Sequence, residues 1–361
     1  MRCKLAFWAA LLLPLFIGCE GKPVAKNPGT GSKTAAGNTA ANSVNESLTG
    51  AVKIEGSSTV GPISAKAREE FNVKYPKVNV SVGEQGTSNG FASFVRKEID
   101  IADASRPIKP AELEKCVAGD IKFYELPVAY DGLTFVVNKE NQFCKQLTLD
   151  QLKKIFRADM AVKTWNELDP SWPAEKIDIF APGINSGTHE YCMEVLVGKE
   201  KITMRADEQI TLSEDDKQLV AGVSGEKFGI GFFGYSYYES SKNKLRAVPI
   251  VNSKGEAIEP TITTVENGTY EPFSRPLFIY VNSNSQDRAE VAEFTTFYLK
   301  NATDIVKKAQ YIPLPAELLE KAMQIVESGA TGTRYINDDG TSAHGPLRDM
   351  LNRTPNNGKA K

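Results

Sequence analysis

The feature that most constrains this chain is a strand that runs into a hydroxyl-rich turn and then into a helix, beginning at residues 52–60. The β-branched run at its start favours a strand, which Gly56 interrupts. Hydroxyl side chains follow at 57–59, and Pro62 stands where a helix begins, since its missing N–H needs no partner there. This arrangement gathers free backbone N–H groups, the positive end of a helix dipole and hydroxyl donors around one point, which suits a small oxyanion.

The same kind of Ser/Thr-rich turn recurs three times along the chain, at 86–90, 104–107 and 185–188. Serine and threonine are also ordinary N-caps, so a single turn of this kind indicates only the start of a helix. The recurrence is what favours an anion site over simple capping. The third turn adds Arg106, whose guanidinium can hold two oxygens of an oxyanion at once.

Strands and helices are predicted to alternate, which is typical of an α/β fold with a mostly parallel sheet covered by helices. Apolar patterns predict strands at 78–82, 99–102, 123–126 and 177–180 and helices at 149–156 and 316–327. In such folds the ligand lies beyond the carboxyl ends of the strands. Two long apolar strands, at 127–138 and 276–281, are suited to carry the chain between two lobes, and the glycine- and aromatic-rich stretch 228–238 predicts close backbone packing.

The N-terminus has the features of an export signal at 1–18. A basic start precedes an apolar run that is too short to span a bilayer. Cys19 directly after this run resembles the lipobox of bacterial lipoproteins and predicts a lipidated first residue, the alternative being a plain secreted protein. Residues 19–49 are poor in large apolar side chains and predict a flexible tether, so the folded body begins near Gly50.

The remaining chain is long enough for two lobes with substantial cores. The 43 basic and 45 acidic residues of the full chain are dispersed, which argues against nucleic-acid binding. No cysteine–histidine spacing typical of zinc ligands occurs, and we expect neither a metal nor another cofactor. In an exported protein Cys116 and Cys144 are the candidate pair for a disulfide, and Cys192 is expected to be a buried thiol.

A serine hydrolase is the alternative in which Ser186 and His189 would be catalytic. The chain has only two histidines, His189 and His344, and triad chemistry requires a serine, a histidine and an acid in one geometry. A histidine directly after a turn more often caps or packs than catalyses. We therefore expect a binding protein rather than an enzyme.

Six short motifs follow one another in the body of the chain: Gly-Ser-Ser-Thr-Val at 56–60, Asp-Ile-Ala-Asp-Ala-Ser-Arg-Pro-Ile at 100–108, Val-Ala-Tyr-Asp-Gly-Leu at 128–133, Ser-Gly-Thr at 186–188, Gly-Phe-Phe-Gly-Tyr at 231–235 and Ser-Arg-Pro-Leu at 274–277. In this order they resemble the PstS/SphX-type phosphate-binding proteins of bacterial ABC importers. The resemblance covers about residues 50–330. It implies a type II periplasmic-binding-protein fold, in which two α/β lobes are joined by crossing hinge strands and phosphate lies in the cleft.

The resemblance also implies the domain boundaries and the site residues. Lobe I would comprise 50–132 and 277–345, lobe II would comprise 133–276, and 346–361 would be a disordered tail. Carried over turn by turn, the phosphate-binding residues are Ser58, Thr59 and Val60; Thr87 and Ser88; Ser105 and Arg106; and Ser186, Gly187 and Thr188.

Two positions depart from the pattern of many relatives. Pro182 stands where they have an arginine, so the positive charge is expected mainly from Arg106. Ser105 stands where some relatives have an aspartate that accepts the proton of phosphate and helps to reject sulfate. Our hypothesis is that Asp103 or Asp131 supplies this acceptor instead.

By resemblance, the protein captures phosphate, closes by a hinge and delivers the ligand to a membrane ABC permease. We expect a monomer in the periplasm or at the cell surface that contacts the membrane only through its lipid anchor. Two alternatives stay open: the same fold binding another tetrahedral oxyanion such as sulfate, phosphonate or arsenate, and a cell-surface interaction protein that uses the fold as a scaffold.

Overall fold

The computed structural model describes residues 47–184, 186–198 and 200–358. The predicted signal, Cys19 and nearly all of the predicted tether lie outside the described residues. The first strand, β1 (Gly50–Gly56), begins where the sequence predicted the folded body to start. Within the described part of the chain, no helix is both long enough and apolar enough to cross a membrane.

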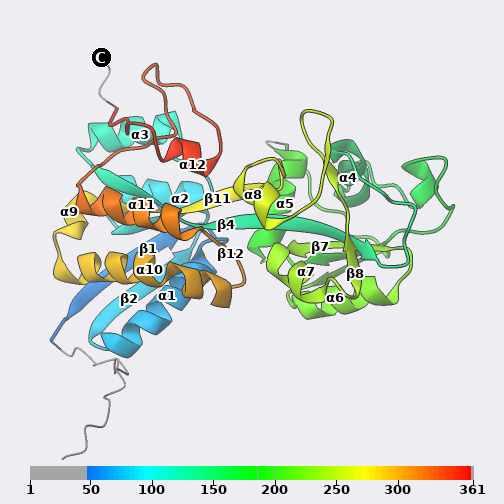
Figure 1. Ribbon diagram of the computed structural model, residues 1–361, viewed down its shortest axis with the longest axis horizontal. Coiled ribbons are helices and arrows are strands. Elements are labelled where there is room, and N and C mark those ends of the chain that lie inside the picture. The colour runs from blue at the N-terminus through cyan, green and yellow to red at the C-terminus, as the bar shows by residue number, and fades with distance from the viewer. Residues whose placement is uncertain (1–46, 185, 199, 359–361) are drawn as a thin grey trace, which may run out of the picture. The chain divides into compact units, whose positions relative to one another are not determined.

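One sheet connects two groups of elements, in the strand order β2-β1-β3-β11-β4-β7-β5-β6 (Figure 1). In the first group, β1 pairs in parallel with β2 (Val78–Glu84) and β3 (Ile101–Ala104), as the alternation of strands and helices predicts. The antiparallel strand β11 (Ser274–Asn282) then joins β3 to β4 (Phe123–Asn138). The sheet is therefore mixed rather than purely parallel.

The strand β4 passes through both groups and changes its partners midway. It pairs with β11 as far as Gly132, and from Leu133 onward it pairs with β7 (Gly229–Gly234). We call the elements on the first part of β4 lobe I and those on the second part lobe II. The two predicted strands 123–126 and 127–138 are thus one strand, because Pro127, which has no N–H for the ladder, lies at a register shift.

Helices cover both faces of the sheet in lobe I. The helices α1 (Gly61–Lys74) and α10 (Ala289–Lys308) pack together through the rings of Phe71, Phe294 and Tyr298. The other face carries α2 (Thr87–Val95) and α3 (Pro110–Ala118), whose apolar side chains pack around Tyr280 of β11. The remaining lobe I elements are α9 (Ser283–Gln286), β12 (Ile312–Pro313), α11 (Ala316–Glu327) and α12 (Leu347–Met350).

Lobe II repeats the strand, turn and helix order. The parallel strands β7, β5 (Asp178–Pro182) and β6 (Ile210–Ser213) lie beside β4, and the predicted close packing at 228–238 is confirmed at Gly231, where a Cβ would lie 2.7 Å from the carbonyl oxygen of Phe180. The other lobe II elements are α4 (Leu149–Phe156), the 3₁₀ turn η1 (Trp165–Glu167), α5 (Gly187–Val197), α6 (Asp216–Gly225), α7 (Tyr235–Ser241), β8 (Leu245–Ala247), β9 (Ile250–Val251), β10 (Ala257–Ile258) and α8 (Ile262–Glu266).

The prediction of a disordered tail at 346–361 is wrong for residues 346–358. Leu347 and Met350 of α12 are buried in the large core cluster, and Thr333 exchanges two backbone hydrogen bonds with Asn356, at 3.0 and 2.7 Å. The segment was predicted to be disordered because its composition is polar. Two of its apolar side chains nevertheless pack into the core and hold it against lobe I.

The predicted Cys116–Cys144 disulfide is not formed, and Cys116, Cys144 and Cys192 are free, buried thiols. Cys116 lies on α3 just before β4, and Cys144 follows the far end of that strand. A strand of 16 residues spans about 50 Å. A disulfide requires Cα atoms within about 7 Å, so the length of β4 separates these cysteines.

Candidate functional site

The first turn is set by a close approach between β1 and β3. Gly56 ends β1 with φ of +146°, and a Cβ at this position would lie 2.1 Å from the carbonyl oxygen of Asp103. The Ser57 N–H donates to that same oxygen at 2.9 Å, and the Ser57 hydroxyl accepts from the Thr59 N–H at 3.2 Å. The chain therefore turns sharply at the end of the strand and enters α1 directly after Val60, as predicted.

The second and third turns are hydrogen-bonded to each other. Gly86, with φ of +85°, precedes α2 and places Thr87 and Ser88 in its first turn. The Thr87 hydroxyl lies 3.1 Å from the Ser105 hydroxyl and accepts from the Ser105 N–H at 3.2 Å. Arg106 Nη2 donates to Ser88 Oγ at 3.0 Å. These four predicted residues form one connected wall in lobe I.

The fourth turn meets the first across the cleft. Ser186 caps α5 by accepting from the Thr188 N–H at 3.2 Å. Gly187 packs so closely on lobe I that a Cβ there would lie 3.0 Å from Thr59 N, Cα and Oγ1. The Ser58 hydroxyl donates to a carboxylate oxygen of Glu190, one turn further along α5. Turns that are more than 120 residues apart in the chain thus lie in direct contact.

The charge of Arg106 is already paired within lobe I. Its guanidinium donates to both carboxylate oxygens of Glu112, at 2.9 and 2.7 Å, in the fork geometry that favours arginine over lysine. Because Glu112 already balances the charge of Arg106, this arginine alone does not supply most of the positive charge of the site as expected. A second cation is required beside it.

That second cation is Arg275, which was not among the residues predicted to bind the ligand. Arg275 Nη2 donates to Thr59 Oγ1 at 3.2 Å and Nη1 to Glu194 at 3.1 Å, and Nε lies 3.4 Å from Asp131. Its guanidinium carbon lies 3.5 Å from the centre of the Tyr191 ring, a cation–π contact. Arg275 thus contacts lobe I, the crossing strand β4 and α5 of lobe II at the same time. The Ser-Arg-Pro-Leu motif contains it, but the register that places Arg275 opposite Asp131 is not readable from the sequence.

Eight of the ten predicted residues line two adjoining cavities, whereas Thr59 and Val60 are buried and line neither. We call the first, of about 240 Å³, the tyrosine pocket, because Tyr235, Tyr237 and Tyr311 line it together with Ser58 and the fourth turn. We call the second, of about 480 Å³, the arginine pocket; Arg106 and Lys109 line it together with the second and third turns. The pockets adjoin at the Ser58–Glu190 hydrogen bond, since Ser58 lines the first and Glu190 the second.

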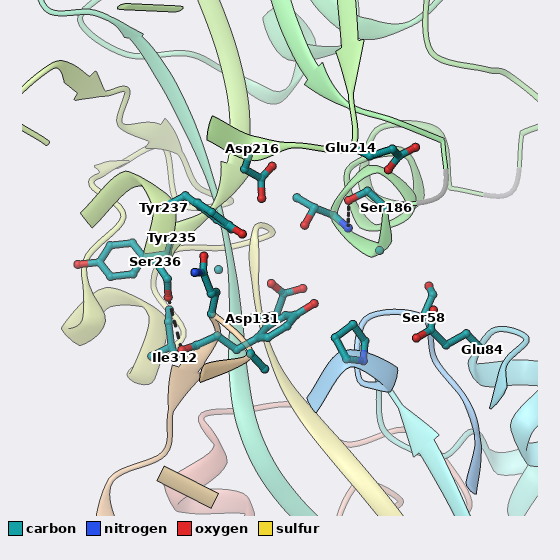
Figure 2. Close-up of a pocket in the computed structure, with 18 residues that line it drawn as sticks. Ser58, Glu84, Asp131, Ser186, Glu214, Asp216, Tyr235, Ser236, Tyr237 and Ile312 are labelled. Atoms are coloured by element: carbon teal, nitrogen blue, oxygen red, sulfur yellow. Dashed lines mark hydrogen bonds between the residues drawn. The ribbon is translucent and has the colours of Figure 1, made fainter. Parts of the chain in front are cut away.

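Carboxylates dominate the tyrosine pocket. Figure 2 shows Asp131 and Asp216 facing the same space, with Glu84 and Glu214 at its other side. Burial, together with repulsion from Asp215 and Glu214, raises the pKa of Asp216 to about 6. Burial raises the pKa of Asp131 as well, although the charge of Arg275 opposes this shift.

The two aspartates expected to replace the missing acceptor are both engaged. Asp103 is fully buried beneath the first turn, where Oδ1 accepts from the Ser64 hydroxyl at 2.9 Å. Burial raises its pKa to about 8, and its Oδ2 has no hydrogen-bond partner among the described residues. Asp131 is only 4% exposed and is paired with Arg275. Asp103 is buried and cannot contact a ligand in the cleft. Asp131 lines the cleft, but it is paired with Arg275.

The structure brings no catalytic triad together in the described part of the chain. His189 Nδ1 lies 2.9 Å from the carbonyl oxygen of Pro182, which agrees with the packing role expected for this histidine. The stretch 86–90 matches Gly-x-Ser-x-Gly, but its central Ser88 accepts from Arg106 and contacts neither described histidine. No group of three or more acidic, histidine or cysteine side chains among the described residues is arranged to hold a metal ion.

Two α/β lobes joined by crossing strands, with a hydroxyl-lined cleft between them, define the class of two-lobed substrate-binding proteins. A family model described as a PBP superfamily domain matches residues 26–302. The chain is 44% identical over 302 residues to protein SphX of Synechococcus elongatus, covering 83% of this chain and 88% of that one. It is 40% identical over 269 residues to the phosphate-binding protein PstS of Staphylococcus haemolyticus, covering 74% and 82% of the two chains.

Solved structures agree with these relatives. A possible phosphate-binding protein from Planctomyces limnophilus is 41% identical with a TM-score of 0.75, covering 78% of this chain and 99% of that one. A putative phosphate ABC transporter substrate-binding protein with bound phosphate, from Clostridium perfringens, is 28% identical with a TM-score of 0.51, covering 73% and 100%. The chain belongs to the PBP superfamily and, within it, to the family that includes PstS and SphX.

Proposed function

We propose that the protein is an extracytoplasmic substrate-binding protein that captures inorganic phosphate between its lobes and delivers it to an ABC permease. The observation that carries the proposal is the meeting of four Ser/Thr turns and two arginines in one cleft. Hydroxyls, arginine forks and backbone N–H groups at helix N-termini are the donors that suit phosphate oxygens. The phosphate-binding protein PstS among the relatives, and the phosphate bound in the Clostridium perfringens structure, support the same ligand.

The proposed ligand residues are the ten predicted from the sequence, with Arg275 added. The turns of α1 and α2 and the loop after β3 act from lobe I, and the turn of α5 acts from lobe II. Because Arg106 and Arg275 are each paired with a carboxylate, phosphate would share these cations with Glu112 and Glu194. The paired carboxylates keep each guanidinium oriented, which lowers the cost of ordering it around a ligand.

Ligand capture would be coupled to closure of the lobes. Phosphate would join the lobe I turns to the α5 turn, and the crossing strands β4 and β11 would provide the hinge between open and closed forms. The closed form would then dock on the permease. Export rests on the N-terminal signal, and lipidation of Cys19 with the tether at 19–49 would hold the protein beside its membrane partner and raise its effective concentration there.

Isothermal titration calorimetry on the purified full chain, stripped of endogenous ligand, tests the proposal. We expect tight binding of phosphate that an excess of sulfate does not displace. Arg106→Ala should weaken phosphate binding at least tenfold, about 1.4 kcal/mol. The matched control is Arg96→Ala, because Arg96 pairs with Glu98 on the exposed surface of the same lobe, at 2.7 Å.

Each alternative predicts another result in the same titrations. Preferred binding of sulfate, a phosphonate or arsenate would retain the cleft as an oxyanion site but reject phosphate as its ligand. Absence of binding for every tetrahedral anion would favour the scaffold alternative. Equal losses in the Arg106 and Arg96 variants would show that the site lies elsewhere.

A further inference from the structure

The helix α5 and the residues just after it carry three carboxylates that line the arginine pocket, and they differ in what they contact. Glu194 is paired with Arg275 at 3.1 Å, and Glu200 is paired with Arg157 at 2.8 Å. Glu190 has neither of these cations and instead accepts the hydrogen bond of the Ser58 hydroxyl from the opposite lobe. Among the described ion pairs, none includes Glu190.

The partner of Glu190 matters because Ser58 is one of the proposed phosphate ligands. A serine hydroxyl has a single proton to donate, so it can serve one acceptor at a time. While the Ser58 hydroxyl donates to Glu190, it can present only its lone pairs to an anion. It then cannot donate a hydrogen bond to the ligand.

The side chains that line the arginine pocket around Glu190 carry charges of both signs. The basic side chains lining the same pocket are Arg106, already held by Glu112, and Lys109, and the other acidic ones are Glu194 and Glu200. In the tyrosine pocket Asp131 contacts the guanidinium of Arg275 rather than a hydroxyl, and no hydrogen bond links Glu84 or Asp216 to a hydroxyl of a proposed ligand residue within the described chain. Glu190 is therefore a carboxylate in direct contact with a ligand hydroxyl.

We propose that Glu190 is an internal competitor for the anion: it occupies the Ser58 hydroxyl across the cleft, and phosphate must displace it to bind. This inference rests on the proposed function of the cleft. The contact joins lobe I to α5 in the way that a bound oxyanion would, so the protein can hold its lobes together through its own carboxylate. The competitor lowers the affinity of the site and makes the release of phosphate easier.

The test is titration of phosphate and of sulfate into the full chain with Glu190→Gln, which keeps the shape but removes the charge. We expect the phosphate affinity of Glu190→Gln to be about tenfold higher than that of the wild type. The phosphate affinity of Glu190→Ala should also be higher. Glu200→Gln is the matched control, since it removes the same charge from the same pocket without touching Ser58. It should change the affinity by less than about twofold.

A double-mutant cycle isolates the contact itself. In a Ser58→Ala background there is no hydroxyl to compete for, so adding Glu190→Gln should no longer raise phosphate affinity. An equal rise with and without Ser58 would overturn the proposal in favour of general repulsion by the carboxylate. Unchanged or weaker phosphate binding in Glu190→Gln would also overturn the proposal. A rise in affinity for sulfate alone would overturn it as well, because Glu190 would then act on the proton of the ligand.

The same titrations separate this inference from the proposed function. Wild-type protein that fails to bind phosphate would reject both. Wild-type protein that binds phosphate selectively, with Glu190→Gln unchanged, would reject the competitor and leave the phosphate site in place.

Discussion

The tyrosine pocket and the arginine pocket adjoin in one cleft but offer opposite electrostatics. No arginine or lysine is found among the described residues that line the tyrosine pocket, and four carboxylates are. The arginine pocket has Arg106 and Lys109 in its lobe I wall, opposite the glutamates of α5. Arg275 lies at the tyrosine side and touches Asp131, yet its other contacts reach Thr59 and α5.

The contrast teaches how an oxyanion can be held without an excess of positive charge. In the proposed site, hydroxyls and helix N-termini from both lobes would donate to the anion, and each arginine would act through a guanidinium that a neighbouring carboxylate already orients. The four carboxylates that line the tyrosine pocket would then disfavour an additional negative charge on the ligand. Three substitutions test whether the two pockets differ in this way.

The largest effect is expected for Arg275→Ala. It removes a cation that touches both lobes and leaves Asp131 buried without its partner, so phosphate affinity should fall about 100-fold, roughly 2.7 kcal/mol. Arg275→Lys retains the charge but not the fork and should fall in between. Calorimetry measures the affinities, and thermal melting of both variants checks that the fold is intact. If Arg275→Ala bound phosphate like the wild type, the arginine pocket alone would supply the cation.

A smaller effect is expected for Gly187→Ala, which tests the contact between the first and fourth turns. The new methyl group would lie 3.0 Å from three atoms of Thr59 and should hold the lobes slightly apart. We expect about a tenfold loss of phosphate affinity with an unchanged melting temperature, since alanine is otherwise favourable in a helix. Gly225→Ala on α6, where no atom lies within 4 Å, is the control and should bind normally. If both variants bound phosphate like the wild type, the close contact between Gly187 and Thr59 would not be needed for phosphate binding.

The smallest effect is expected for Asp216→Asn and depends on pH. Because the pKa of Asp216 is raised to about 6, the carboxyl group is charged above this pH and largely neutral below it. The substitution should therefore raise phosphate affinity about threefold at pH 8 and change it little at pH 5. Titrations of both proteins at the two pH values cancel the protonation of phosphate itself. An equal effect at pH 5 and pH 8 would contradict a role for this charge.

Much of the local structure was predictable from the sequence. The helices predicted at 149–156 and 316–327 are α4 and α11 with the same bounds. The strand, turn and helix at 50–74 and at 178–197 were predictable because Gly56, Pro62 and the Ser-Gly-Thr turn impose their backbone geometry on near neighbours. The predictions that failed concern distant partners: the disulfide crosses β4, and the tail is ordered through Leu347 and Met350.

The chemical groups available to this protein could be recognised from its sequence: the four hydroxyl turns, the α/β alternation and the balance of charge. How these groups are paired became visible only in the folded chain. The strand register places Arg275 opposite Asp131 and so in the site. Arg106 forms an ion pair with Glu112, and Glu190 of α5 accepts a hydrogen bond from Ser58. Backbone preferences act over a few residues and can be recognised locally, whereas the contacts of a side chain depend on strands and helices that folding brings together from distant parts of the chain.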